Sequence, residues 1–207
     1  MIGLERSRLT LDQVWFGATG TATLAPLRRI QSEESSLIVR ACTFTDMCLP
    51  GQAPLNNVSE HLWGRGVPAS GVLLVEGCTF GRTPGHNDAI DFDAVAGLPG
   101  VPEIRDNVFL GGGDDALDLE TDAVVEGNRF HDYVKDAYNT DPQESNVISA
   151  GAGKHYFVTR NSFWNCQHAV QVKDHATLAF LNNTVVGAMT SAIYFGCLLY
   201  TSPSPRD

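Results

Sequence analysis

Acidic side chains gather in the middle of this sequence, where carboxyl groups can act as general acids, general bases or ligands of a cation. Between His86 and Glu144 there are 15 Asp and Glu residues against only Arg105, Arg129 and Lys135. The whole chain of 207 residues carries a formal net charge of −10. A surface of this kind repels nucleic acid phosphates and attracts cations or a cationic partner. We therefore exclude nucleic acid as a partner.

Two acidic segments alternate in a way that predicts β-strands with one buried face. In DAIDFD (88–93), the apolar residues point inward while Asp91 and Asp93 point outward. In DALDLE, which begins 27 residues later, Asp118 and Glu120 take the outward positions. Carboxyl groups on separate strands act together only if a framework places those strands side by side.

An internal repeat supplies that framework. A short strand pattern recurs seven times, at intervals of 28, 36, 29, 21, 33 and 22 residues. Its copies end at Phe16, Phe44, Phe80, Phe109, Phe130, Phe163 and Val185. A second strand pattern follows the last five copies, in the segments DAIDFD, DALDLE, DAYNTD, HAVQVK and SAIYFG. One such unit cannot bury its apolar face alone, so the repeat predicts coils stacked at a strand spacing of about 4.7–4.9 Å.

The sequence thus predicts an all-β fold, a right-handed parallel β-helix (solenoid) of about seven coils over residues 9–196. Residues 1–8 are expected to be a disordered or truncated start. Residues 197–207 are turn-rich and have no counterpart in the repeats, so they are expected to be a non-native or disordered tail. Loop insertions are expected on one side of the stack, at 49–70, 95–103 and 142–156.

One position of the repeat predicts a ladder of side chains running from coil to coil. It holds asparagine in four coils, at Asn107, Asn128, Asn161 and Asn183. An asparagine there can satisfy buried backbone groups at a turn and bond to the next asparagine. Cys42 and Cys78 take this position in earlier coils, either as a packed pair of thiols or as a disulfide.

Stacking the second strands in register predicts two outward columns. The first contains Asp91, Asp118, Asn139 and Gln171, and the second contains Asp93, Glu120, Asp141 and Lys173. Like charges one strand spacing apart destabilise a sheet unless something offsets them. A bound cation, raised carboxyl pKa values or screening by solvent would each do so. If the cation is Ca²⁺, its expected ligands are Asp91, Asp93, Asp118, Glu120 and Asp141.

The repeats from Leu9 to Phe195, with their asparagine turns and D-A-I-D strands, resemble the parallel β-helix repeats of the pectate-lyase-like superfamily. Within them, HNDAID and GGGDDALDLE resemble the N-T-D and G-D-D motifs of the polygalacturonase family of glycoside hydrolases. That resemblance implies that Asp88, Asp114 and Asp115 are the catalytic carboxyl groups of an inverting hydrolysis. The later G-H-G and R-I-K motifs of that family have no counterpart here.

A β-eliminating polysaccharide lyase is the other enzyme class that the superfamily suggests. Such an enzyme would use calcium and a basic residue, for which the repeat register offers Lys135, Lys173 and Arg160. We therefore add Lys135 to the catalytic candidates. The substrate-binding candidates are His86, Asp136, Asn139, His168 and Lys173.

The sequence predicts an extracellular module that acts on or binds polysaccharide, with Ca²⁺ as its one expected cofactor. The alternative is a non-catalytic repeat scaffold or adhesion domain of a larger exported protein. Secretion or display on the cell surface is expected, although MIGLERSRLT has no apolar signal segment. The sequence has no run of 18 apolar residues, so no membrane span is predicted. The module is expected to be a monomer or part of a longer chain.

Overall fold

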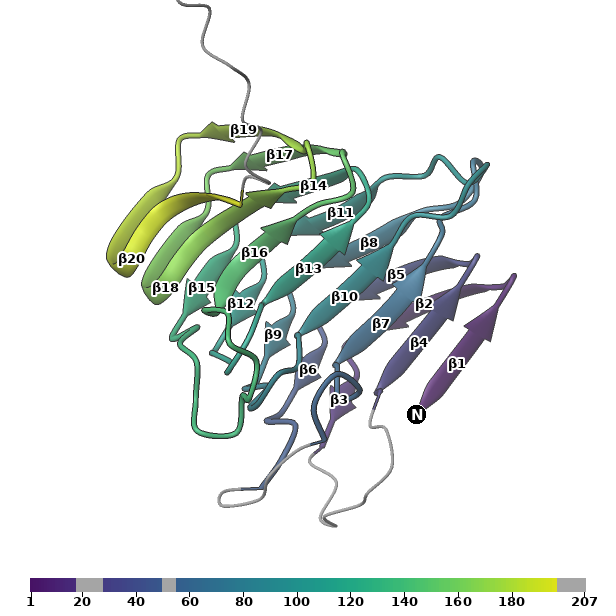
Figure 1. Cartoon of the computed structure of the whole chain (residues 1–207). Coiled ribbons are helices and arrows are strands. Elements are labelled where there is room, and N and C mark those ends of the chain that lie inside the picture. Colours follow the sequence, from purple (N-terminus) through teal and green to yellow (C-terminus); the bar gives the residue numbers. More distant parts are fainter. Residues whose placement is uncertain (18–27, 50–54, 197–207) are drawn as a thin grey trace, which may run out of the picture.

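The fold is a stack of parallel β-strands. The computed structural model describes residues 1–17, 28–49 and 55–196, and within these ranges it has twenty strands and no helix. Every strand pair is parallel, and the strands form a 13-stranded and a 7-stranded sheet (Figure 1). This arrangement is a parallel β-solenoid, as the alternating repeats predict. No helix in the described ranges is long and apolar enough to cross a membrane.

The first arm of the 13-stranded sheet carries the acidic repeats on its outer face, and we call it the first face. Its strands, in the order in which they pair, are β1 (Ile2–Glu5), β4 (Ile30–Glu33), β7 (Leu62–Arg65), β10 (Ile90–Asp93), β13 (Leu117–Glu120), β16 (Asn146–Ala150), β18 (Ser162–Lys173) and β20 (Thr184–Gly196).

The second arm of the same sheet contains the short strands that hold the repeated phenylalanines. These strands are β3 (Trp15–Phe16), β6 (Thr43–Phe44), β9 (Thr79–Phe80), β12 (Val108–Phe109) and β15 (Arg129–His131). The two arms join through β18, which pairs with β15 near its beginning and with β16 toward its end.

The 7-stranded sheet lies behind the first face in Figure 1. It consists of β2 (Arg8–Asp12), β5 (Ser36–Arg40), β8 (Leu73–Glu76), β11 (Pro102–Arg105), β14 (Ala123–Glu126), β17 (His155–Thr159) and β19 (Thr177–Leu181). A tight turn separates most of its strands from the second arm, so most coils contribute one strand to the first face, one to this sheet and one to the second arm.

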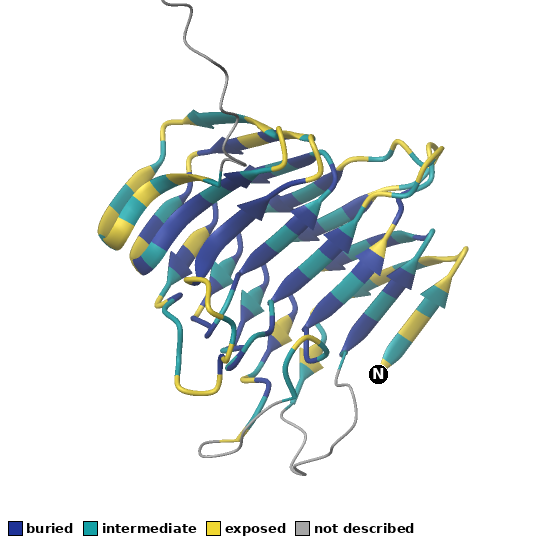
Figure 2. Cartoon of the chain, in the orientation of Figure 1, coloured by how far each residue is buried: buried dark blue, intermediate teal, exposed yellow. Residues whose placement is uncertain are grey.

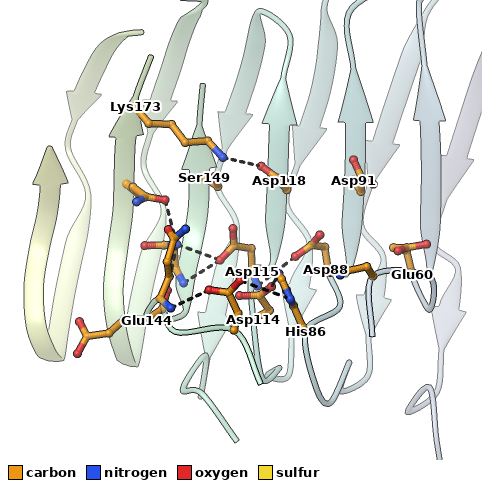
Figure 3. Close-up of a pocket in the computed structure, with 15 residues that line it drawn as sticks. Glu60, His86, Asp88, Asp91, Asp114, Asp115, Asp118, Glu144, Ser149 and Lys173 are labelled. Atoms are coloured by element: carbon orange, nitrogen blue, oxygen red, sulfur yellow. Dashed lines mark hydrogen bonds and ion pairs between the residues drawn. The ribbon is translucent and has the colours of Figure 1, made fainter. Parts of the chain in front are cut away.

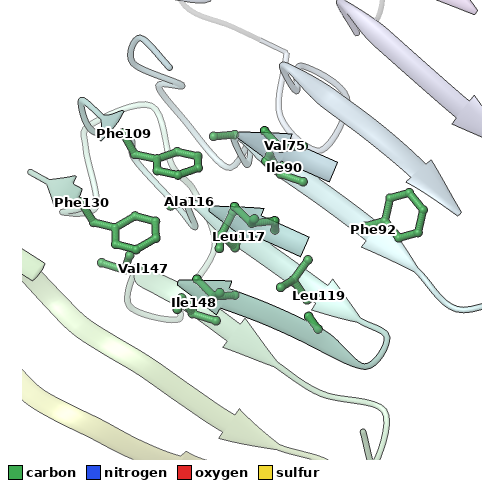
Figure 4. Close-up of a cluster of buried hydrophobic side chains, with 14 of the residues drawn as sticks. Val75, Ile90, Phe92, Phe109, Ala116, Leu117, Leu119, Phe130, Val147 and Ile148 are labelled. Atoms are coloured by element: carbon green, nitrogen blue, oxygen red, sulfur yellow. The ribbon is translucent and has the colours of Figure 1, made fainter. Parts of the chain in front are cut away.

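The core lies between the sheets and consists of the inward members of each alternating strand. The repeated phenylalanines stack in one row, with ring centroids 4.6–4.8 Å apart from Phe16 through Phe44, Phe80 and Phe109 to Phe130. Figure 4 shows Phe109 and Phe130 next to each other, beside the aliphatic side chains of the core. Burial is deepest in the middle coils, and exposure grows at both ends of the stack (Figure 2).

The predicted asparagine ladder is present. The Nδ2 of Asn107 donates to Oδ1 of Asn128 at 2.9 Å, and the Nδ2 of Asn128 donates to Oδ1 of Asn161 at 3.0 Å. Asn161 contacts Asn183 in the same way at 3.1 Å. Cys42 and Cys78 continue this column as free thiols, so the disulfide alternative is wrong.

Two predicted loops contain strands instead. The strand β7 lies within 49–70, and β16 lies within 142–156. The segment DAYNTD from Asp136 was predicted to be a strand because it begins like DAIDFD and DALDLE, but it forms part of the loop 132–145. It differs from them in lacking an alternating apolar pair, so β16, with its buried Ile148, takes the place on the first face.

The sequence predicts that the loops lie on one side of the stack. The described loops lie instead at two corners of it. Residues 81–89, 110–116 and 132–145 precede strands of the first face, whereas 94–101 follows one. The stack of paired strands also begins earlier than its predicted start at Leu9, because β1 pairs with β4 from Ile2 onward. The expected tail, 197–207, lies outside the described residues.

Candidate functional site

A cleft of about 240 Å³ lies over the first face, where β10, β13, β16 and β18 run side by side (Figure 3). Eight acidic residues line it: Glu60, Asp88, Asp91, Asp114, Asp115, Asp118, Asp141 and Glu144. The remaining lining residues are Asn57, His86, Gln143, Asn146, Ser149, Gln171 and Lys173. The cleft therefore brings together most of the carboxyl groups that the sequence singles out.

The corner before each strand places the three carboxyl groups of the polygalacturonase-like motifs. Asp88 precedes β10, and Asp114 and Asp115 precede β13, one coil further along the stack. The Asp115 amide donates to Oδ1 of Asp88 at 3.2 Å. The loop approaches closely at Gly113, where a Cβ atom would lie 2.6 Å from Oδ2 of Asp136. Any larger residue would displace the corner that carries Asp114.

Burial makes Asp88 and Asp115 hard to ionise. Desolvation raises the pKa of the Asp88 carboxyl well above its usual range, and the charge of Asp115 adds to the effect. Desolvation likewise raises the pKa of Asp115, followed by the charge of Asp114. Asp115 differs in that its Oδ1 accepts hydrogen bonds from the amide and Nδ2 of Asn146, at 2.8 and 3.2 Å. These bonds favour its ionised form.

The side chain of Asp114 is 13% exposed, whereas Asp115 is buried. Burial raises its pKa to about 6, opposed by His86 and increased by Asp118 and Asp141. The Nε2 of His86 lies 3.1 Å from Oδ2 of Asp114, and its Nδ1 lies 3.9 Å from Oδ2 of Asp141. Asp114 is therefore a carboxyl group that exchanges its proton near neutral pH while facing a cleft.

The prediction that acidic residues of each outward column lie next to one another is confirmed for the strands β10 and β13. Asp91 pairs in register with Asp118, and Asp93 pairs with Glu120. Burial, followed by the charge of Asp118, raises the pKa of Asp91 to about 8. Raised pKa values are thus one way in which the like charges of the columns are offset.

The ammonium group of Lys173 is a second way in which the like charges of the columns are offset. Its Nζ lies 3.3 Å from Oε1 of Glu120 and 3.7 Å from Oδ1 of Asp118. Burial lowers the pKa of Lys173, but these carboxylates together raise it above its ordinary value. The ammonium group therefore stays charged and is held by the columns.

The columns differ from the prediction beyond Asp118. Ser149 pairs with Asp118, and Gln171 pairs with Ser149, so Asn139 does not belong to the first column. Asp141 does not belong to the second column, because its loop folds back along the cleft. Among the described residues, no group of three or more His, Cys, Asp and Glu side chains is arranged to hold a metal ion. The Ca²⁺ site stays a prediction.

Lys135 lies outside the cleft lining. Its Nζ donates to the backbone oxygens of Asp141 and Gln143 and so closes its own loop. This contact holds Lys135 within its own loop, outside the cleft lining, and the catalytic role of Lys135 stays a prediction.

Asp136 and Asn139 also hold the loop together. Asp136 accepts hydrogen bonds from the amides of Gly85, Tyr138 and Asn139 at 2.8–3.1 Å. Asn139 is buried, and its Nδ2 donates to the Gly113 oxygen at 2.7 Å. Both residues support the corner of Asp114 from behind instead of lining the cleft.

His168 lies in an adjoining depression instead of in the cleft. Its Nε2 is 2.8 Å from Oε2 of Glu144, its Nδ1 is 2.8 Å from Oγ of Ser191, and its ring stacks on Tyr194 at 5.0 Å. Asp93 and Glu120 also lie outside the cleft lining. Of the predicted substrate-binding residues, His86 and Lys173 do line it.

Sequence reasoning missed Asn146 and Ser149, which come from β16. Both side chains are nearly buried, at 5% and 1% exposure. Within the described residues, Oδ1 of Asn146, Oγ of Ser149 and Oδ1 of Asp118 have no hydrogen-bond partner. The short alternation of Ile148, Ser149 and Ala150 within β16 was the signal that could have identified this strand.

Comparisons of the chain with family models, with curated proteins and with solved structures gave no significant match. The interpretation of the cleft therefore depends on its own geometry and chemistry.

Proposed function

We propose that this chain is an extracellular glycoside hydrolase module that cleaves polysaccharide, built on a right-handed parallel β-helix of about seven coils. A right-handed path is expected because connections between parallel strands of one sheet are right-handed in about 98% of cases. The observation that carries the proposed activity is the proximity of Asp88, Asp114 and Asp115 at one end of an open cleft. Their positions also agree with the resemblance to the polygalacturonase motifs.

Asp114 is the proposed general acid. A pKa of about 6 leaves the carboxyl group protonated under mildly acidic conditions and able to donate its proton to the glycosidic oxygen. As that proton is transferred, the bond between the anomeric carbon and the leaving oxygen breaks.

Asp115 is the proposed general base. Its carboxylate removes a proton from a water molecule, whose oxygen forms the new bond to the anomeric carbon. Because desolvation and the charge of Asp114 raise the pKa of Asp115, this role requires Asp115 to be ionised while Asp88 and Asp114 keep their protons. The two hydrogen bonds from Asn146 support the ionised form of Asp115. Asp88 stays protonated beside it, because three neighbouring carboxyl groups release their protons in coupled steps.

A lyase is less well supported, since β-elimination needs a basic residue beside the sugar. Lys135 contacts loop carbonyls, and Arg160 pairs with Glu126 of the 7-stranded sheet. Lys173 is held by two carboxylates. All three basic candidates therefore have other partners.

Substitution of the proposed acid tests the activity. Asp114→Asn should lower the release of reducing ends from polysaccharide by about 10²–10⁴-fold, the range attributed to a general acid. The thermal unfolding midpoint should change little, because Asp114 is partly exposed. A matched control is Glu103→Gln, which removes a carboxylate from β11 in the 7-stranded sheet and should leave activity unchanged.

The rival is a non-catalytic scaffold or adhesion domain. Under that alternative, wild-type protein releases no reducing ends from any neutral, acidic or basic polysaccharide in a broad panel. That result, obtained with folded protein, would overturn the proposed hydrolase.

A further inference from the structure

The cleft has an excess of negative charge and hydrogen-bond acceptors. Eight of its fifteen lining residues carry a carboxyl group. Among the described residues that line it, Lys173 is the one lysine or arginine, and Asp118 and Glu120 already bind its ammonium group. A ligand that brings further negative charge would meet repulsion here without a free cation to receive it.

Three buried oxygen atoms on the floor of the cleft indicate which chemical groups a ligand would bring there. Among the described residues, Oδ1 of Asn146 and Oγ of Ser149 have no hydrogen-bond partner, and Oδ1 of Asp118 has only the Lys173 ammonium group, at 3.7 Å. The Nδ2 of Asn146 already donates to Asp115 and to Oε1 of Gln171, so the free atom of that amide is an acceptor. Buried acceptors without donors are energetically costly, and a ligand rich in N–H and O–H groups would satisfy them.

We infer that the cleft binds a polysaccharide of amino sugars, whose ammonium groups lie against Asp91, Asp118 and Ser149. The inference rests on the proposed hydrolase and names its substrate class. Each sugar unit of such a polymer offers one ammonium group with three N–H donors, together with hydroxyl groups. A polyuronate offers a carboxylate at each unit instead, and that group would lie against the carboxyl groups of the cleft.

Repulsion within the empty cleft adds to the argument. The pKa of Asp91 is raised by burial and then by the charge of Asp118, and the opposing charge of Arg28 is the smallest of the contributions. An ammonium group between the two carboxyl groups would relieve the repulsion and gain charge-assisted hydrogen bonds. Lys173 shows the same chemistry one strand further along, where its ammonium group bridges Asp118 and Glu120.

Calcium fits these atoms less well than an ammonium group does. Ca²⁺ takes six to eight oxygen ligands at about 2.3–2.6 Å, which requires several carboxylates to converge. Among the described residues, no group of three or more acidic, imidazole or thiol side chains is arranged in that way. Ammonium groups along a polymer can instead bind one carboxyl group at a time.

The inference is tested by calorimetric binding of three hexasaccharides, made of glucosamine, N-acetylglucosamine or galacturonic acid, to wild-type protein and to Asp114→Asn. Reducing ends are measured in parallel with the wild type. The glucosamine hexamer should bind at least about 10-fold more tightly than the N-acetylated one, since a desolvated ion pair contributes about 1.4 kcal/mol or more. The galacturonate hexamer should bind weakest.

The outcomes separate the two proposals. Tight binding of the glucosamine hexamer without cleavage supports the substrate class and overturns the hydrolase. Cleavage of galacturonate or N-acetylglucosamine oligomers in preference to glucosamine supports the hydrolase and overturns the substrate class. Equal affinity for all three hexamers, or tighter binding of Ca²⁺ alone than of the glucosamine hexamer, also overturns the substrate class.

Two variants locate the binding. Asp118→Asn and Ser149→Ala should each weaken binding of the glucosamine hexamer by about 5–50-fold and change binding of the N-acetylated hexamer much less. The matched control is Glu103→Gln, which removes one carboxylate from β11 in the 7-stranded sheet. If the control weakens binding as much as Asp118→Asn does, the attraction is a property of net charge and the assignment to this cleft is wrong.

Discussion

At the scale of the residue, the account depends on the protonation of Asp114. Its carboxyl group faces the cleft, and burial raises its pKa although His86 lies 3.1 Å away and opposes the shift. Two neighbouring aspartates, Asp88 and Asp115, are buried more deeply and are harder to ionise. Three carboxyl groups in slightly different surroundings can therefore take different roles.

The pH dependence of hydrolysis follows from this arrangement. The general acid must carry its proton and the general base must have lost its own, so activity should fall as pH rises through the pKa of Asp114, about 6, and should fall again at lower pH, where Asp115 is protonated. The measurement is kcat/KM between pH 4 and 9 on a cleaved oligosaccharide. His86→Gln removes the positive charge that opposes the shift, so its falling limb should move to higher pH. If the falling limb of the pH profile lies at the same pH in His86→Gln as in the wild type, the role given to His86 is contradicted.

At the scale of the element, stacking places like charges on adjacent strands. Asp91 on β10 faces Asp118 on β13, and its raised pKa of about 8 means that the folded chain binds this proton more tightly than the unfolded chain. The stability that this proton gives is complete below about pH 4 and is lost as pH rises toward 8. The cleft therefore lowers stability under alkaline conditions.

Asp91→Asn should remove this loss of folding stability at alkaline pH. At pH 9 the variant should be more stable than the wild type by on the order of 2 kcal/mol, whereas at pH 4 the two should agree within error. Urea denaturation at both pH values measures this. Glu103→Gln, on the opposite sheet and beside Arg105, should show no such pH-dependent gain. A variant that is less stable at pH 9 would show that Asp91 is held ionised by a partner.

The asparagine ladder is the other stabilising feature at this scale. Asn128 donates to the Ile104 oxygen and to Asn161, and its Oδ1 accepts from the amide and Nδ2 of Asn107. Asn128→Ala leaves these buried groups unpaired and should cost about 3 kcal/mol. Asn183→Ala removes a similar set nearer the end of the stack, where water can replace it, and should cost about 1 kcal/mol. Thermal unfolding compares the two, and equal losses would argue against burial as the cause.

The strands were predictable where their signal is local. Alternation and the repeated phenylalanines identified most of the second-arm strands and the facing of Asp91 and Asp118. The strands β7 and β16 were missed because their sequences, LWGR and NVISA, lack the Asp-Ala beginning of the neighbouring repeats. DAYNTD has that beginning but not the apolar alternation. Burial of the alternating face, and not resemblance at the first two residues, decides which segment joins the ladder.

At the scale of the whole molecule, the cleft is assembled from coils far apart in the sequence. Glu60 and Lys173 line the same cleft, although 113 residues separate them. Repeat register predicted five of the eight carboxyl groups of the cleft, which lie on or directly before strands: Asp88, Asp91, Asp114, Asp115 and Asp118. It did not predict Glu60 or Glu144, and it placed Asp141 in a column to which it does not belong. Nor did it predict the positions of Lys135, Asp136 and Asn139, because the path of a loop depends on the hydrogen bonds that it finds. Such contacts leave no periodic signal.

The central claim is that stacking of coils creates a cleft in which one carboxyl group, that of Asp114, keeps its proton up to about pH 6. Carboxyl ¹³C NMR titration of the folded protein, with Asp114→Asn used to assign the resonance, measures this directly. The account predicts a midpoint of about 6 for Asp114. A midpoint near 4, the value of an ordinary solvated aspartate, would contradict it.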